Sequence, residues 1–109
     1  MRIARVLGTV ICNRQLPELP PGRFLICEAL DAAGVRQADE YVPRTSPMPE
    51  SLIVFDQLGA GAGELIAVSE GREACMPFYP EKVPLDAYCS AILDSVSIDP
   101  DFAELPEAP

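Results

Sequence analysis

The sequence contains no histidine. Without this side chain, Ser-His-Asp and Cys-His nucleophile pairs cannot form, and histidine metal sites are excluded. Cysteine occurs four times, but no two cysteines have the Cys-x-x-Cys spacing of zinc ribbons or thioredoxin-like redox sites. The sequence therefore lacks the residue patterns of several common classes of enzyme and metal site.

Basic residues are scarce: 8 Lys and Arg stand against 17 Asp and Glu, for a net charge of −9. Nucleic acids and anionic membranes attract basic surfaces, so neither is expected as a partner. No apolar run approaches the roughly 18 residues of a membrane span. The first apolar stretch is interrupted by Arg5 and Gly8 and does not resemble a signal peptide, so we expect a cytoplasmic protein.

The length of 109 residues and a hydrophobic content of 49% predict one small domain with a packed core. We expect this domain to span residues 1–98. The remaining residues, 99–109, hold four acidic residues, three prolines and no basic residue. This composition is typical of a flexible tail on the surface.

The distribution of β-branched and apolar residues favours short strands over helices. Gly8 within the first run indicates a bulge or a sharp bend. Residues 86–98 fit a helix or a strand by composition, and the spacing of Ile92, Val96 and Ile98 favours a strand. The expected strands are 2–12, 23–30, 35–42, 52–56, 64–69 and 86–98. Such short strands separated by Gly and Pro turns predict a mainly all-β fold, a small β-barrel.

The connections between these strands carry their own signals. Gly34 is expected to take a left-handed conformation in a tight turn after Asp31. Residues 43–51 contain three prolines and are expected to form an extended surface loop. Residues 71–76 fit one helical turn that ends before Pro77.

The cysteines are expected to act mainly as small apolar residues in a reducing compartment. Cys12, Cys27 and Cys89 lie in apolar runs, which predicts burial, whereas Cys75 precedes Pro77 and Pro80 and is expected to be more exposed. A reactive thiol at Cys75 would need an activating cation, and only Arg72 is close in sequence.

Glycine is concentrated between Asp56 and Glu64, where Gly59, Gly61 and Gly63 alternate with alanines. The dinucleotide fingerprint does not fit, because its third glycine position is Glu64 and a strand is expected to follow. The pattern predicts a tight loop that another backbone, such as a second subunit, approaches closely. Asp56 and Glu64 could cap amides of this loop or pair with cations of a partner.

Carboxylates are numerous, but no spacing singles out a catalytic pair. Carboxylate-only metal binding stays open, although no calcium-loop pattern appears, and we expect no cofactor. The candidate carboxylates are Asp39, Glu40, Asp56, Glu64, Asp86 and Asp94.

Several segments in order resemble the vertex proteins of bacterial microcompartments, the EutN/CcmL family. The most specific is Asp56-Gln-Leu-Gly-Ala-Gly-Ala-Gly-Glu64. The others are Ile3-Ala-Arg-Val-Leu-Gly-Thr-Val10, Phe24-Leu-Ile-Cys-Glu-Ala-Leu-Asp31 followed by Gly34, Pro84-Leu-Asp-Ala87 and Ala91-Ile-Leu-Asp-Ser-Val96. The sequence departs from the family's usual pattern at Arg72-Glu-Ala-Cys75, in the 42–51 loop and at 76–83.

This resemblance implies a five-stranded barrel like an oligonucleotide-binding (OB) fold, assembled as a cyclic pentamer, beside which we expect one short helix. It implies a structural role at the vertices of a microcompartment shell, with hexameric and pseudo-hexameric shell proteins as partners. By position, the assembly residues would be Asp56, Gly59, Ala60, Gly61, Gly63, Glu64 and Asp86.

Two other functions are kept beside this one. An OB-like barrel could be a nucleic-acid or ligand-binding module, but that use needs a basic groove with stacking aromatics, and the basic residues here are few and scattered. A small enzyme using Cys75 or a carboxylate pair is the other alternative.

Overall fold

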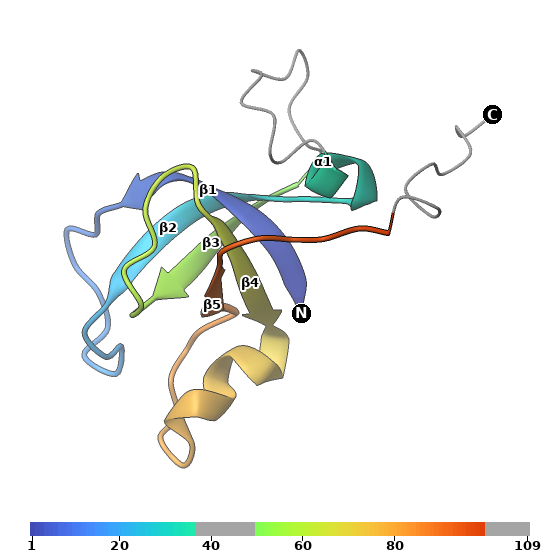
Figure 1. The fold of residues 1–109 in the computed structure, drawn as a ribbon. Coiled ribbons are helices and arrows are strands. Elements are labelled where there is room, and N and C mark those ends of the chain that lie inside the picture. The colour runs from blue at the N-terminus through green and yellow to red at the C-terminus, as the bar shows by residue number, and fades with distance from the viewer. Residues whose placement is uncertain (37–49, 100–109) are drawn as a thin grey trace.

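The computed structural model describes residues 1–36 and 50–99, and five of their segments are strands that form a closed barrel (Figure 1). The strands are β1 (Arg2–Val10), β2 (Arg23–Ala29), β3 (Ser51–Asp56), β4 (Leu65–Glu70) and β5 (Ala87–Leu93). Around the barrel they follow the order β1-β2-β3-β5-β4, and every pairing except the parallel β3–β5 pair is antiparallel. The predicted five-stranded barrel is confirmed.

Alternation along the strands separates an inner from an outer face. In β2, Leu25 and Cys27 are buried while Ile26 between them is exposed. The inner side chains form one apolar core that also includes a residue from the loop between β3 and β4. Its members are Ala4, Val6, Leu25, Cys27, Val54, Ala60, Ile66, Val68, Ala87 and Cys89.

A second apolar cluster lies outside the barrel, where the 3-10 helix η1 (Gly71–Phe78) packs beside β4 and β5. Phe55 on β3 stacks on Tyr88 with ring centroids 6.3 Å apart and meets Phe24 edge-on at 5.3 Å. Phe78 from η1 closes the cluster against Tyr88 at 5.4 Å. Phe55 pairs with Phe24 across β2 and β3, so both side chains lie on the outer face of the barrel. Phe55 is nevertheless only 1% exposed, because the cluster covers it.

The predicted irregularity at Gly8 is confirmed, because the register between β1 and β2 shifts between Val6 and Gly8. The prediction that 86–98 favours a strand is confirmed for Ala87–Leu93 and is wrong for residues 94–98, which follow the end of the strand. The predicted helical turn at 71–76 is present as η1, but it continues through Pro77 to Phe78. The missing N–H of Pro77 costs only the one bond to the carbonyl three residues before it, and the helix ends at the next residue.

The expectation of a strand at 35–42 is wrong where it can be compared, because Val35 and Arg36 end the helix α1 (Ala32–Arg36). Asp31 starts this helix, since its Oδ1 accepts a hydrogen bond from the Gly34 amide at 2.8 Å. Gly34 is thus a buried helical residue and not the left-handed turn residue that we expected. The rest of that predicted strand (37–42), residues 43–49 of the predicted proline loop and residues 100–109 of the tail lie outside the described residues.

The cysteine predictions are partly wrong. Cys27 and Cys89 are buried as expected, but Cys12 lies beyond the end of β1 and is exposed. Cys75 is half-buried, and its thiol donates to the carbonyl oxygens of Val83 and Leu85, each at 3.1 Å. The burial predicted for Cys12 depended on a first strand that reaches residue 12, but β1 ends at Val10.

Candidate functional site

The loop between β3 and β4, residues 57–64, contains most of the predicted assembly residues, and we call it the glycine loop. Ala60, fully buried, projects from this loop into the barrel core. The loop is also tied to β1, because the Gly63 amide donates to the Val6 carbonyl at 2.8 Å and the Val6 amide donates to the Glu64 carbonyl at 2.9 Å. The loop is therefore a structural part of the barrel and not a loose connection.

Asp56 at the end of β3 organises this loop. Its Oδ1 accepts from the Leu58 amide at 3.0 Å, and its Oδ2 accepts from the amides of Gly59 at 3.0 Å and Ala60 at 2.9 Å. Arg23 on β2 donates from Nη2 to the same Oδ2 at 3.1 Å. The side chain is 0% exposed, so these four bonds replace the water that a carboxylate would otherwise bind.

The charge of Asp56 is stabilised by these contacts. Burial alone would raise the pKa of the Asp56 carboxyl, but the hydrogen bonds from the three loop amides and Arg23 outweigh it together. The pKa of Asp56 is therefore lowered from its ordinary value. A buried, ionised carboxylate that accepts four hydrogen bonds from its own subunit is suited to fixing a loop.

The three glycines of the loop differ in what they require. Gly59 and Gly63 have φ of 94° and 90°, in the left-handed region where a side chain is strained. Gly61 has no such φ, and its amide donates to Glu64 Oε1 at 2.7 Å. A left-handed φ thus explains the glycines at positions 59 and 63, whereas no such φ requires a glycine at position 61.

Six of the seven predicted assembly residues lie together in this loop or at its edge, and Asp86 does not. Asp86 is exposed and precedes β5, where its carbonyl accepts from the Gly71 amide at 2.8 Å. β4 separates the two places, because Glu64 precedes its first residue and Gly71 follows its last. The prediction that Asp56 and Glu64 cap loop amides is confirmed by their hydrogen bonds.

Arg23, which joins the loop to β2, was not predicted as a site residue from the sequence. Its Nη2 donates to the Ala60 carbonyl at 2.6 Å in addition to its bond with Asp56. Gln57 was missed as well, and its side chain bridges Pro21 and Tyr88 through hydrogen bonds of 2.9 and 3.1 Å. No local pattern marks either residue, because each contact joins segments more than 30 positions apart.

The thiols near the core are poor nucleophiles. Burial first, and then the negative charge of Asp56, raises the pKa of Cys27 to about 11. Burial likewise raises the pKa of Cys89 to about 12, with further contributions from Asp56. Both thiols are therefore protonated near neutral pH.

Other kinds of site find little support in the described part of the chain. Within it, no group of three or more acidic or cysteine side chains is placed to hold a metal ion. The glycine loop leads into β4 and not into a helix, which excludes the dinucleotide-binding arrangement. Phe24, Phe55, Phe78 and Tyr88 pack on one another instead of forming an open stacking surface for bases. No helix in residues 1–36 and 50–99 is long and apolar enough to cross a membrane.

Comparison with protein families gives a match along the whole barrel. The EutN/CcmL family model, described as "Ethanolamine utilisation protein EutN/carboxysome", matches residues 1–94. A carboxysome shell vertex protein CcmL of Gloeobacter violaceus is 33% identical over 99 residues, which cover 91% of this chain and 88% of that protein. The microcompartment shell vertex protein PduN of Salmonella typhimurium is 30% identical over 97 residues, which cover 89% and 99% of the two chains.

Solved structures resemble the barrel to a similar extent. The Gloeobacter violaceus CcmL structure has a TM-score of 0.73 and 33% identity, with 91% of each chain covered. A structure described as the GrpN pentameric microcompartment shell protein from Rhodospirillum rubrum has a TM-score of 0.70 and 25% identity, covering 91% of this chain and all of that one. The similarity therefore extends over most of each chain and not over an isolated motif.

Proposed function

This chain belongs to the EutN/CcmL family, and from that premise we propose that it is a structural protein whose pentamers form the vertices of a microcompartment shell in the cytoplasm. The observation that carries this function is the match along residues 1–94, which contains the whole barrel and the glycine loop. A flat sheet of hexagonal tiles cannot close, and pentagonal tiles supply the missing curvature. The shell then encloses enzymes and restricts the escape of their intermediates.

The proposed subunit performs no chemistry of its own. Its relatives are named for a position in a shell and not for a reaction. The buried carboxylate of Asp56 is occupied by four hydrogen bonds inside the subunit, and the thiols of Cys27 and Cys89 are buried. These residues therefore support a structural function over the alternative of a small enzyme.

We further propose that the glycine loop and Asp86 contact neighbouring subunits or the hexameric and pseudo-hexameric shell proteins. Leu58 is 53% exposed on the loop, and Glu64 is exposed beside Gly61. Asp56 and Ala60 are buried, so their contribution is to hold the loop in place. Gly59, Gly61 and Gly63 would allow a partner's backbone to approach closely.

The first prediction is a solution mass of five chains. A single chain has a mass of 11.8 kDa, and native mass spectrometry or multi-angle light scattering at micromolar concentration resolves monomer from pentamer. We expect five copies because an odd, closed ring is the form that fits a five-fold vertex. A monomer under these conditions would remove the ring on which the proposed function depends.

The second prediction concerns Gly61→Leu, which we expect to prevent assembly while leaving a folded chain. A Cβ at this position would lie 3.3 Å from Glu64 Oε1, the end of a flexible exposed side chain that can move away. A bulky side chain would instead block a backbone that approaches the loop. Light scattering should give a mass below five chains, and circular dichroism should retain the strand signal.

Ala33→Leu is the matched control, because Ala33 is exposed on α1, outside the glycine loop. This variant should keep the mass of the unmodified protein. Loss of the strand signal in Gly61→Leu would mean that Gly61 is needed within the subunit, and an unchanged mass would mean that no partner approaches it.

A further inference from the structure

An apolar strip covers part of the outer face of β1, β2 and β3. Ile26 on β2 pairs with Gly8 on β1 and with Ile53 on β3, so the three positions form one row across the sheet. Ile26 is 36% exposed and Ile53 is 50% exposed, and neighbouring positions on β1 continue the surface. We call this surface the apolar band, and its members are Leu7, Val10, Ile26 and Ile53.

The four side chains of the band carry no charge, whereas the whole chain has a net charge of −9. Two such chains repel each other through their charges, so a stable contact between them has to use uncharged surface. Contiguous exposed apolar residues on a small protein mark an interaction surface. The band also continues into the glycine loop, because Val6, which precedes Leu7, is hydrogen-bonded to Gly63 and Glu64.

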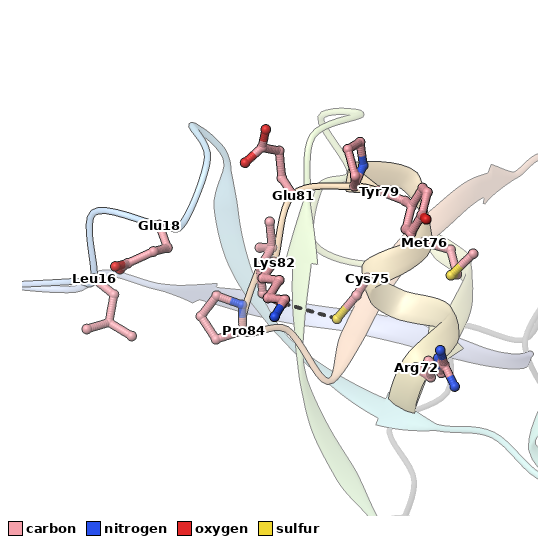
Figure 2. A pocket seen from close by; sticks show the side chains of 11 residues that line it. Leu16, Glu18, Arg72, Cys75, Met76, Tyr79, Glu81, Lys82 and Pro84 are labelled. Carbon is pink, nitrogen blue, oxygen red and sulfur yellow. Dashed lines mark hydrogen bonds between the residues drawn. The ribbon is translucent and has the colours of Figure 1, made fainter.

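A groove of about 640 Å³ lies elsewhere, between the connection that follows β1 and the segment that runs from η1 to β5 (Figure 2). Figure 2 shows Leu16 and Glu18 on one side and Cys75 and Met76 on the other. Its apolar lining residues are Leu16, Met76, Tyr79, Pro80, Val83 and Pro84. Met76 and Tyr79 are 50% and 77% exposed, so apolar side chains at this groove also lack a covering partner within the described residues.

Band and groove share no residue. Their rims offer charges of both signs. Arg23 and Glu28 occur on β2 beside the band, while the groove carries Glu18 and Glu81 as well as Arg72 and Lys82. Opposite charges can therefore meet around an uncharged centre when one surface covers the other.

The number of subunits decides how these two surfaces are used. If the band paired with the band of another copy, each contact would be two-fold and an odd ring could not satisfy all its members. A ring of five instead requires a contact between two different surfaces of each subunit. A raised apolar row and a concave apolar groove are such a pair.

We propose that the apolar band of one subunit packs into the groove of the next subunit around the ring. The inference rests on the proposed pentamer and adds which two surfaces meet in it. The side chains of Ile26 and Ile53 enter the groove beside Met76 and Tyr79. Cys75, whose thiol donates to Val83 and Leu85 at the groove wall, becomes covered by this contact.

The test uses one charged substitution on each surface, Ile53→Glu in the band and Met76→Glu at the groove. Both positions are 50% exposed, so the subunit can accommodate a charge without burying it. We expect native mass spectrometry to show a fall from five chains to one for each variant. Ile92→Glu is the matched control, because Ile92 is 36% exposed on β5 and belongs to neither surface, and it should remain pentameric.

Mixing the two variants gives a sharper result. The Ile53→Glu subunit keeps its groove and the Met76→Glu subunit keeps its band, so a mixture has one intact contact. At high concentration it should form mixed dimers of one copy each and no larger ring. If either variant stays pentameric, or if the mixture forms no mixed dimer, the proposal is wrong.

Alkylation of thiols tests whether the groove is covered by the next subunit or by the acidic segment 100–109 of the same chain. Cys75 should react more slowly in the pentamer than in monomeric Ile53→Glu, while exposed Cys12 serves as the internal reference. If ending the chain after Asp99 exposes Cys75 in an intact pentamer, the segment occupies the groove and the proposal is overturned. A monomeric unmodified protein would contradict the proposed function itself, whereas pentameric variants would contradict only this pair of surfaces.

Discussion

Replacing Asp56 with alanine is expected to lower the free energy of unfolding by at least about 1.5–3 kcal/mol, the contribution of one hydrogen bond to a charged acceptor. The change leaves the amides of Leu58, Gly59 and Ala60 without their acceptor and Arg23 without its carboxylate. An amide bond to a charged acceptor contributes roughly 1.5–3 kcal/mol, and such bonds are not additive. Urea denaturation measures the effect directly.

Glu64→Ala is the matched control within the same loop. Glu64 is exposed and accepts one amide hydrogen bond, from Gly61 at 2.7 Å. Its removal should lower the free energy of unfolding by at most about 1 kcal/mol, because water can replace the lost acceptor. Equal effects of the two substitutions would show that burial and the number of bonds at Asp56 do not matter.

The dependence on pH gives a further check on Asp56. Its pKa is lower in the folded chain than in the unfolded chain, so its ionised form stabilises the fold. This stability is fully present above the unfolded pKa of about 3.9 and is lost as the pH falls through the lower, folded value. The difference in unfolding free energy between the unmodified protein and Asp56→Asn should therefore shrink as the pH falls below about 4.

The role of Asp56 also clarifies how a shell protein can use a glycine-rich loop. Three glycines in five residues would give an isolated segment high conformational entropy in the unfolded chain. The carboxylate of Asp56 and the insertion of Ala60 into the core restrict this loop to one shape. The loop can then present its backbone around Gly61 to a partner without losing further entropy on binding.

The strands could be predicted from sequence because their signals are local. Alternation in residues 23–29 and the β-branched runs at 2–10 and 51–56 require no knowledge of the partner strand. The bulge at Gly8 was equally visible. The prediction for 35–42 was wrong because Asp31 caps a helix that begins at Ala32. Glycine is typical of turns, so Gly34 indicated a turn although it lies inside this helix.

The candidate site could be predicted only in part. The glycine loop and both capping carboxylates were identified from their spacing, since each cap joins residues two to four positions apart. Arg23 was missed because its bonds to Asp56 and Ala60 depend on the register between β2 and β3. The same holds for the close approach of the Phe55 ring to Gly22, which brings the loop before β2 next to the end of β3.

Gly22→Ala is expected to lower the free energy of unfolding by about 1–3 kcal/mol, the range for overpacking a packed site. A Cβ at Gly22 would lie 2.3 Å from Phe55 Cζ, 2.7 Å from Cε2 and 3.0 Å from the Asp56 carbonyl oxygen. The ring of Phe55 has little room to retreat, because it packs against Phe24, Phe78 and Tyr88. Gly22 has no positive φ, so the effect is steric.

Gly8→Ala is the control for this substitution, since a Cβ at Gly8 would make an ordinary contact of 3.8 Å with Ile26 Cγ2. Its effect should stay within about 0.5 kcal/mol. Thermal unfolding measures both variants, and near-ultraviolet circular dichroism reports whether Phe55 and Tyr88 have moved. If Gly22→Ala is as stable as the unmodified protein, the ring can leave its position at no cost, and the aromatic cluster does not hold β3 in place. If it is destabilised as expected, the packing of Phe55 against its aromatic neighbours helps to hold β3, the strand that ends at Asp56, in place.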